Sequence, residues 1–412
     1  MFGALGHPLY DAAPISVRTN LASMRTFLCS CGNNLYFGNS SCLLCGSTVG
    51  FEPTSREMIR LNPDGEFRLC RNGVDYAACN WLVRDGQEYC PSCSLNRTVP
   101  DLSLEENLVA WRKIEAAKRR VLFTLLELGF DLISKKDNPE AGLAFDILRP
   151  TPTQNVLTGH ENGVITLNLD EANDAERERR REVLGEADRT LAGHLRHESA
   201  HYYWDRFFAG RLDDDQCLRA YRELFGDERA DYQAALQRHY ANGPRPDWAA
   251  DCITAYASSH PWEDWAETWT HYLHITDAME TASVFGLHDV TTPAAHFPEE
   301  TIELPCGLSL RRMEAARFLA VIENWTQISP ALNELAESLG HSTLYPYALS
   351  APVVRKLNFI HFMVQTRSER RSDIFHAVPT QKVTAGSPTP GPVATGTSQE
   401  PAGHRAEASF AA

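Results

Sequence analysis

The fold is decided by one stretch, Thr190-Leu-Ala-Gly-His-Leu-Arg-His197-Glu198-Ser-Ala-His201-Tyr-Tyr-Trp-Asp205. Its apolar residues recur at helical spacing and it contains no proline, so we predict a helix. Positions i and i+4 lie on one face of a helix, so His197 and His201 can direct two imidazoles to one point. Glu198 lies about 100° further around the axis, beside that point. The pattern His-Glu-x-x-His therefore indicates a zinc ion bound by two histidines, with a carboxylate next to the water that the metal activates.

The composition is that of a globular protein with an acidic balance. The 412 residues leave room for two domains, 43% of them are hydrophobic, and the formal net charge is −15. An excess of negative charge argues against general affinity for nucleic acids or anionic membranes. No apolar run is long enough to cross a bilayer or to act as a signal peptide, so we expect no membrane association.

Eight of the eleven cysteines fall between residues 29 and 93, in close pairs. In a long chain without an export signal, such pairs indicate metal thiolates rather than disulfides, and we expect a cytoplasmic protein. Two structural zinc sites of the ribbon type would supply much of the folding free energy of this region. An interleaved assignment of ligands between the two sets remains open. The expected sets are Cys29, Cys31, Cys42 and Cys45, and Cys70, Cys79, Cys90 and Cys93.

The charge of the cysteine-rich region is balanced. Residues 24–98 contain seven Lys or Arg and seven Asp or Glu. A nucleic-acid-binding ribbon would carry a basic patch, so a structural role or docking of a protein partner is the better interpretation.

The region between the cysteines and the predicted His-Glu-x-x-His helix (residues 190–205, called the metal helix below) is predicted to contain one long helix and a small sheet. Apolar spacing predicts a helix from about residue 104 to 128, and its basic cluster Lys118-Arg119-Arg120 is interpreted as a solvated face. Residues 143–148 are predicted to form a strand, and residues 156–169 a hairpin that turns at Asn162-Gly163. The alternating charges of residues 176–182 indicate an exposed helix.

A second informative stretch follows the metal helix, Pro261-Trp-Glu263-Asp-Trp-Ala-Glu267. Proline fits the first position of a helix, and acidic residues in the first turn are stabilised by the helix dipole. Glu263 and Glu267 are four residues apart and share one face of the helix. Their negative charges would repel one another there, and interaction of both carboxylates with a zinc–histidine network would outweigh this repulsion. Further helices are predicted over residues 214–225, 227–240, 310–338 and 352–364.

Several blocks carry a family resemblance: Cys79-Asn-Trp-Leu-Val, Leu95-Asn-Arg-Thr-Val-Pro-Asp-Leu, Leu157-Thr-Gly-His-Glu-Asn-Gly-Val-Ile-Thr-Leu-Asn, Arg196-His-Glu-x-x-His-Tyr-Tyr-Trp-Asp and His260-Pro-Trp-Glu-Asp-Trp-Ala-Glu. From about residue 24 to about residue 365 the chain resembles the bacterial zinc-binding metallopeptidases with an N-terminal zinc ribbon. The resemblance implies an α+β protein in which the ribbon precedes a mainly helical, zincin-like peptidase domain with a small β-sheet.

The order of the two motifs is also similar to that of the gluzincins. That resemblance implies Glu263 as the third zinc ligand and Glu267 as the carboxylate that orients a ligand histidine, and Asp205 is another candidate for orienting one. His260, His271 and His274 remain competing ligands. Tyr256 resembles the site tyrosine of lethal-factor-like gluzincins and is a candidate oxyanion donor or, equally, a core residue. In such peptidases an edge strand pairs with extended substrate, and residues 164–168 are the candidate for it.

These observations predict four segments and one function. Residues 1–23 are expected to be disordered or to precede the true start, 24–98 to form the ribbon, 99–370 the peptidase domain, and 371–412 a disordered tail. The expected function is hydrolysis of peptide or protein substrates by a zinc-activated water, with Glu198 as general base and one catalytic and two structural zinc ions. The alternatives are a non-catalytic zinc scaffold that binds a protein partner and a nucleic-acid-binding ribbon protein.

Overall fold

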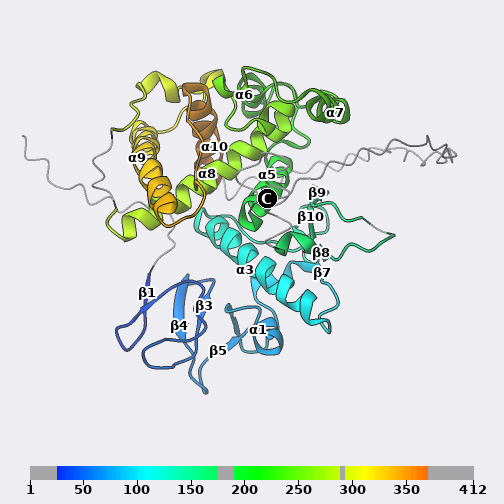
Figure 1. The fold of residues 1–412 in the computed structure, drawn as a ribbon, viewed down its shortest axis with the longest axis vertical. Coiled ribbons are helices and arrows are strands. Elements are labelled where there is room, and N and C mark those ends of the chain that lie inside the picture. The colour runs from blue at the N-terminus through cyan, green and yellow to red at the C-terminus, as the bar shows by residue number, and fades with distance from the viewer. Residues whose placement is uncertain (1–25, 154, 174–189, 288–292, 370–412) are drawn as a thin grey trace, which may run out of the picture. The chain divides into compact units, whose positions relative to one another are not determined.

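The computed structural model describes residues 26–153, 155–173, 190–287 and 293–369. The predictions for residues 1–23, for the charged run 176–182 and for the tail 371–412 lie outside these residues. Figure 1 shows the order of the elements along the chain.

The cysteine-rich region consists of short antiparallel strand pairs. β1 (Phe27–Leu28) pairs with β2 (Asn34–Leu35), β3 (Val49–Glu52) with β4 (Glu57–Arg60), and β5 (Phe67–Leu69) with β6 (Leu82–Arg84). Two short helices, α1 (Arg71–Tyr76) and α2 (Pro91–Ser94), complete the region. Strands of this length bury little apolar surface by themselves. Their core is an aromatic cluster in which the ring centroids of Phe51 and Trp81 lie 5.2 Å apart and that of Phe123, from the next helix, lies 5.3 Å from Phe51.

The rest of the described chain is mainly helical. Among the described residues, no helix combines the length and apolarity that crossing a bilayer requires. The long helices are α3 (Glu105–Glu127), α5 (Leu191–Phe208), α6 (Gln216–Phe225), α7 (Tyr232–Asn242), α8 (Pro261–Val284), α9 (Arg312–Ser338) and α10 (Ala351–Glu369). The short 3₁₀ turns are η1 (Leu169–Ala172), η2 (Trp248–Ala250), η3 (Tyr256–Ser259), η4 (Glu299–Ile302) and η5 (Pro305–Gly307).

The one four-stranded sheet in the described residues has the order β7-β8-β10-β9. β7 (Asn96–Thr98) and β10 (Val164–Asn168) lie parallel to β8 (Ala144–Leu148), and β9 (Gly159–Glu161) is antiparallel to β10. The hairpin turns at Asn162 and Gly163, as predicted, because both adopt the positive φ that a two-residue turn requires. The prediction that residues 164–168 form the edge strand is wrong: β10 is paired on both sides, and the terminal strands of this sheet are β7 and β9.

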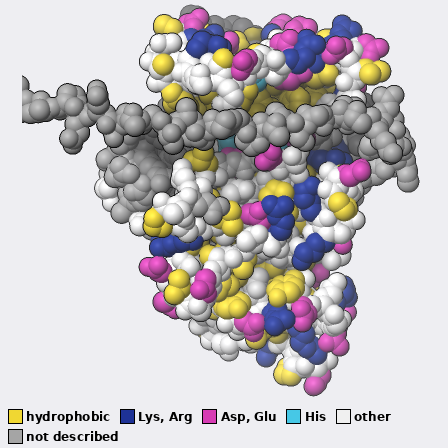
Figure 2. Space-filling view, turned by 90° about the vertical axis from the view of Figure 1, so that its right-hand side faces the viewer, with side chains coloured by type: hydrophobic (Ala, Val, Ile, Leu, Met, Phe, Trp, Pro, Cys, Tyr) yellow, Lys and Arg dark blue, Asp and Glu magenta, His cyan; other side chains and the backbone are white. Residues whose placement is uncertain are grey.

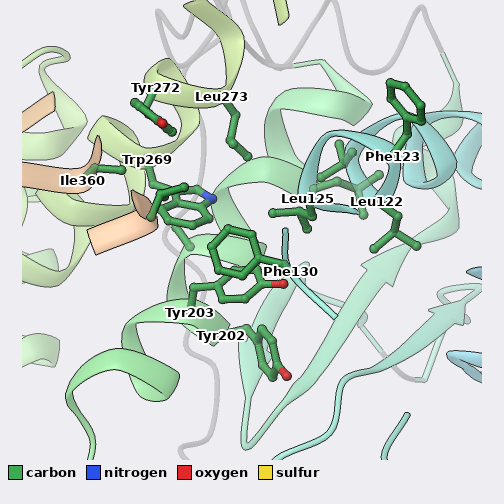
Figure 3. Close-up of a cluster of buried hydrophobic side chains, with 14 of the residues drawn as sticks. Leu122, Phe123, Leu125, Phe130, Tyr202, Tyr203, Trp269, Tyr272, Leu273 and Ile360 are labelled. Atoms are coloured by element: carbon green, nitrogen blue, oxygen red, sulfur yellow. The ribbon is translucent and has the colours of Figure 1, made fainter. Parts of the chain in front are cut away.

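The core joins α3, α5 and α8. Trp265 and Trp269 on α8 are completely buried, and Trp269 stacks on Tyr203 of α5 with ring centroids 5.2 Å apart. Figure 3 shows Tyr203 and Trp269 meeting Phe130, which follows α3, with Leu122 and Leu125 of α3 to one side of them. Tyr202 and Tyr203 are both buried in this core, and the Tyr202 hydroxyl donates to the carbonyl of Ala141. These contacts place the metal helix α5 between the sheet and α8 (Figure 1).

The basic cluster on α3 is a solvated face only at Arg120, which is exposed, and the prediction is wrong for Lys118 and Arg119. Lys118 is completely buried and Arg119 is 8% exposed. Lys118 Nζ lies 2.7 Å from Glu115 Oε1, and Arg119 donates to the carbonyl of Ala78 in the ribbon. Buried charges of this kind require partners, and here the partners are on α3 itself and on the cysteine-rich region. A periodicity argument could not detect them, because the partner residues arrive from other elements.

Candidate metal centres

Helix α5 places the His-Glu-x-x-His residues against α8. The side chain of Thr190 caps its first turn by accepting from the Gly193 backbone N–H at 2.9 Å. His201 and Glu198 are buried, whereas His197 is partly exposed. The helical spacing therefore brings the two imidazoles to the same side, as the sequence predicted, with ring centroids 4.9 Å apart.

Helix α8 supplies the acidic residues. Pro261 occupies its first turn, and the ring of His260 accepts from the Trp262 backbone N–H at 3.0 Å. His260 is thus the cap of the helix, and its other ring nitrogen lies 3.1 Å from the carbonyl oxygen of Ala230. The start of α8 at Pro261 directs both Glu263 and Glu267 toward α5.

Ligand atoms of His197, His201 and Glu263 lie within 4.8 Å of one another. The two Nε2 atoms are 3.2 Å apart, and Glu263 Oε2 is 3.0 Å from His197 Nε2. Glu263 Oε1 lies 3.7 Å from His201 Nε2. Three atoms of the types that zinc prefers therefore converge from two helices.

The hydrogen bonds around this cluster fit a cation at its centre. His197 Nδ1 lies 2.7 Å from Glu267 Oε1, so the ring proton resides on Nδ1 and the lone pair of Nε2 faces the cluster. Glu263 Oε2 is buried and, among the described residues, accepts no hydrogen bond, despite its short distance to His197 Nε2. Two electron-rich atoms placed this close need a positive charge between them, which a proton or a metal cation can supply. The residues present therefore fit a zinc ion.

Glu267 does not join the cluster but fixes one of its histidines. Its second oxygen, Oε2, accepts from the Thr254 hydroxyl at 2.8 Å, and Thr254 in turn accepts from the Ala257 backbone N–H at 3.0 Å. This chain of hydrogen bonds orients the carboxylate toward His197. Sequence reasoning missed Thr254, which lies 13 residues before Glu267 and belongs to no motif.

Tyr232 is a second residue that sequence reasoning missed. Its hydroxyl, on α7, donates to Glu263 Oε1 at 2.7 Å. The predicted tyrosine, Tyr256, starts η3 with its ring centroid 6.1 Å from that of His197, and no described residue hydrogen-bonds its hydroxyl. The two phenols thus differ: one holds a carboxylate of the cluster, and the other lies beside it.

The remaining candidates lie apart from the cluster. His271 contacts the Tyr345 hydroxyl at 3.0 Å, and the ring of His274 packs against those of Trp325 and Tyr345. Asp205 forms no hydrogen bond with His201, whose Nδ1 is buried without a partner among the described residues. Burial raises the pKa of Asp205 to about 6. The structure does not bring these groups to the cluster.

The carboxylates around the cluster control its protonation. Burial alone would lower the pKa of His197, but hydrogen bonds and charge from Glu263 and Glu267 outweigh it and raise the pKa well above its usual value. Burial likewise favours neutral Glu263, yet the charges of His201 and His197 lower its pKa to about 2. For His201, burial dominates and lowers the pKa to about 3. The negative potential that favours a proton here also favours a divalent cation.

Glu198 sits beside the cluster without joining it. It is 8% exposed, and burial raises its pKa to about 7, opposed by the charge of His197. A carboxylate with this pKa can both accept and release a proton near neutral pH.

The eight paired cysteines form two separate sets. Cys29, Cys31, Cys42 and Cys45 bring their Sγ atoms within 4.8 Å of one another, and so do Cys70, Cys79, Cys90 and Cys93. The interleaved assignment that the sequence left open is therefore excluded. None of the eleven cysteines forms a disulfide.

Backbone amides point at the sulfurs, as in zinc knuckles. In the second set, Cys70 Sγ accepts from the Cys90 N–H at 3.4 Å and Cys79 Sγ from the Trp81 N–H at 3.4 Å. Cys93 Sγ lies 4.0 Å from Glu115 Oε2, which connects this set to the buried charges of α3. The metal sites of the ribbon and the helical core therefore share contacts.

Comparison with known proteins agrees with these sites. Residues 107–363 match the profile of a family described as "Putative zinc-binding metallo-peptidase", and residues 26–104 match a zinc-ribbon domain. Proteins from Mycobacterium bovis and Mycobacterium tuberculosis, each named only as an uncharacterized protein, are 41% identical over 344 residues, covering 83% of this chain and 95% of the relative. No solved structure matches the chain significantly. The chain therefore belongs to this zinc-binding metallopeptidase family, with a zinc ribbon before the peptidase domain.

Proposed function

We propose that the protein is a zinc-dependent peptidase of the gluzincin type. One observation carries the proposal: His197 Nε2, His201 Nε2 and a carboxylate oxygen of Glu263 converge within 4.8 Å, while His197 Nδ1 is anchored by Glu267. Three protein ligands are typical of catalytic zinc sites, whereas structural sites are closed by four. When bound, zinc would supply Lewis acidity and lower the pKa of water in the site.

Glu198 is the proposed general base. It lies beside the cluster, and its pKa of about 7 suits a group that removes a proton from water and returns it to the leaving amine. Tyr256 is the proposed donor to the developing oxyanion, because its hydroxyl is uncommitted among the described residues. Tyr232 is committed to Glu263 and is proposed to hold the ligand carboxylate.

The open edge of the sheet supports a peptide substrate. β9 has a strand neighbour only on the β10 side among the described residues, and it contacts α5. An extended peptide can add to such an edge through main-chain hydrogen bonds. We therefore move the proposed substrate-binding edge from β10 to β9.

Metal content and cleavage together test the proposal. Zinc-loaded protein should contain three zinc ions per chain, one for each ligand group, and should cleave members of a mixed peptide library, detected by mass spectrometry. Glu198→Gln should retain all its zinc and lose cleavage by at least about 100-fold, because it keeps the shape but not the base. The matched control is Glu334→Gln, an exposed glutamate of α9. If Glu198→Gln cleaves like wild type, the base assignment is wrong.

A scaffold that binds a protein partner through the ribbon is the second candidate. It is favoured by the side chains of Leu43 and Leu44, which lie between two ligand cysteines and are 87% and 69% exposed. Zinc-loaded wild type that cleaves no peptide would favour it. A nucleic-acid role has less support, since acidic and basic side chains are interspersed on the face of the molecule that Figure 2 shows.

A further inference from the structure

Helix α5 presents two imidazoles to solvent, not one. From Gly193 to Tyr203, every residue is buried except His194 and His197, which are partly exposed. The two are three residues apart and therefore lie on neighbouring positions of one face. His197 belongs to the metal cluster, whereas His194 has no place in the function described above.

His194 is held as firmly as a ligand histidine. Its Nδ1 lies 2.5 Å from Glu171 Oε2, and Glu171, on η1, is 6% exposed. The other oxygen of Glu171 accepts from the Thr158 hydroxyl at 2.6 Å, and Thr158 accepts from the Asn168 backbone N–H at 3.1 Å. The ring of His194 is therefore fixed by a buried carboxylate that is itself held at both oxygens.

This anchor determines which atom of the ring is available. With Nδ1 bound to Glu171, Nε2 is on the opposite side of the ring, and no described residue hydrogen-bonds it. The pair His194–Glu171 thus repeats the arrangement of His197–Glu267. In each pair a carboxylate binds Nδ1, and Nε2 points away from that carboxylate. His194 is not among the residues whose ligand atoms converge on the metal site, so its Nε2 is available to something else.

The surroundings of His194 are those of the proposed substrate path. It lies on α5 four residues before Glu198, the proposed base, so the two side chains are neighbours on one face of the helix. Thr158, which fixes Glu171, immediately precedes the edge strand β9. His194 is therefore linked through Glu171 and Thr158 to the start of β9, and it shares a helix with the proposed general base.

We propose that His194 is a substrate-binding residue whose Nε2 hydrogen-bonds the main chain of a peptide bound between β9 and Glu198. This inference rests on the proposed peptidase function and adds a residue that contacts the substrate itself. A peptide main chain fits because it offers both N–H donors and C=O acceptors, and an imidazole nitrogen can pair with either kind of group.

Two hydroxamate probes separate this role from metal binding. Acetohydroxamic acid reaches only the zinc, whereas a tripeptide hydroxamate adds a main chain beside it. Binding of each to zinc-loaded full-length protein is measured by calorimetry, with zinc content measured in parallel. His194→Ala should weaken the tripeptide hydroxamate about tenfold, the value of one hydrogen bond, and leave acetohydroxamate within about twofold of wild type. Zinc should stay at one ion for each of the three groups.

The controls use the other parts of the pair. His194→Leu keeps more of the ring's volume and should show the same loss, and Glu171→Gln should show a smaller one in the same direction. His296→Ala is the matched control, since His296 also pairs with a glutamate, Glu323, at 2.9 Å but is 86% exposed at its side chain.

The outcomes distinguish this inference from the proposed function. Wild type that binds both probes, with folded His194 variants that bind them equally well, overturns the inference alone. Loss of both probes together with zinc would make His194 a metal-site residue and would also overturn it. Zinc-loaded wild type that binds neither probe removes the proposed function, and the inference with it.

Discussion

The two tyrosines near the cluster allow a sharp test of the metal-site geometry. Tyr232→Phe removes one hydroxyl, which donates to the Glu263 carboxylate at 2.7 Å. Hydrogen bonds to charged groups contribute about 1.5–3 kcal/mol. The bond exists with or without zinc. Only the part of its free energy that orients Glu263 for the metal therefore affects the zinc affinity. We expect a contribution at the lower end of this range, about 1.5 kcal/mol, which corresponds to a roughly tenfold weaker zinc affinity of the proposed catalytic site.

The assay is competition against a chromophoric zinc chelator, which resolves the catalytic site from the two four-cysteine sites. Tyr256→Phe is the matched control, because that phenol lies beside the cluster without bonding a ligand. It should leave zinc affinity unchanged while lowering cleavage. Equal zinc affinity in wild type and Tyr232→Phe would refute the role of Tyr232, and weaker affinity in Tyr256→Phe would exchange the two roles.

Three further predictions concern the other groups. Glu263→Ala should lower the zinc content by one ion per chain, whereas Glu267→Ala should only weaken that site by about 10–100-fold; the reverse order would exchange their roles. Burial lowers the pKa of His361 to about 4, so the folded state resists a proton that the unfolded chain takes up below about pH 6.5. Stability should therefore fall between pH 6.5 and about 4, by up to about 1.4 kcal/mol per unit, and His361→Gln should lessen this slope in urea unfolding. Lys118→Met leaves Glu115 buried without its closest cation and should destabilise the fold by about 3–5 kcal/mol. Glu115→Gln in the same chain should restore most of this loss, and a double variant in which the two losses of unfolding free energy simply add would contradict the pairing.

The sequence predicted what depends on neighbours within one helical turn. The four-residue interval between His197 and His201 specifies a shared face, and Pro261 specifies the start of α8. The Asn162-Gly163 turn and the close cysteine pairs are of the same kind, since steric limits on the backbone act over a few residues. The fold class and the family, in contrast, came from the resemblance that the longer sequence blocks carry.

Only the tertiary structure decided contacts between residues far apart in the chain. The resemblance implied that Glu267 orients a ligand histidine, and the structure identifies that histidine as His197, 70 residues away. The contact of Tyr232 with Glu263 across 31 residues and that of Glu171 with His194 across 23 had no signal in the sequence. Packing also made β9 rather than β10 the edge and buried Lys118. Spacing cannot predict such pairs, because they depend on how helices and strands pack and on which buried charges must then be matched.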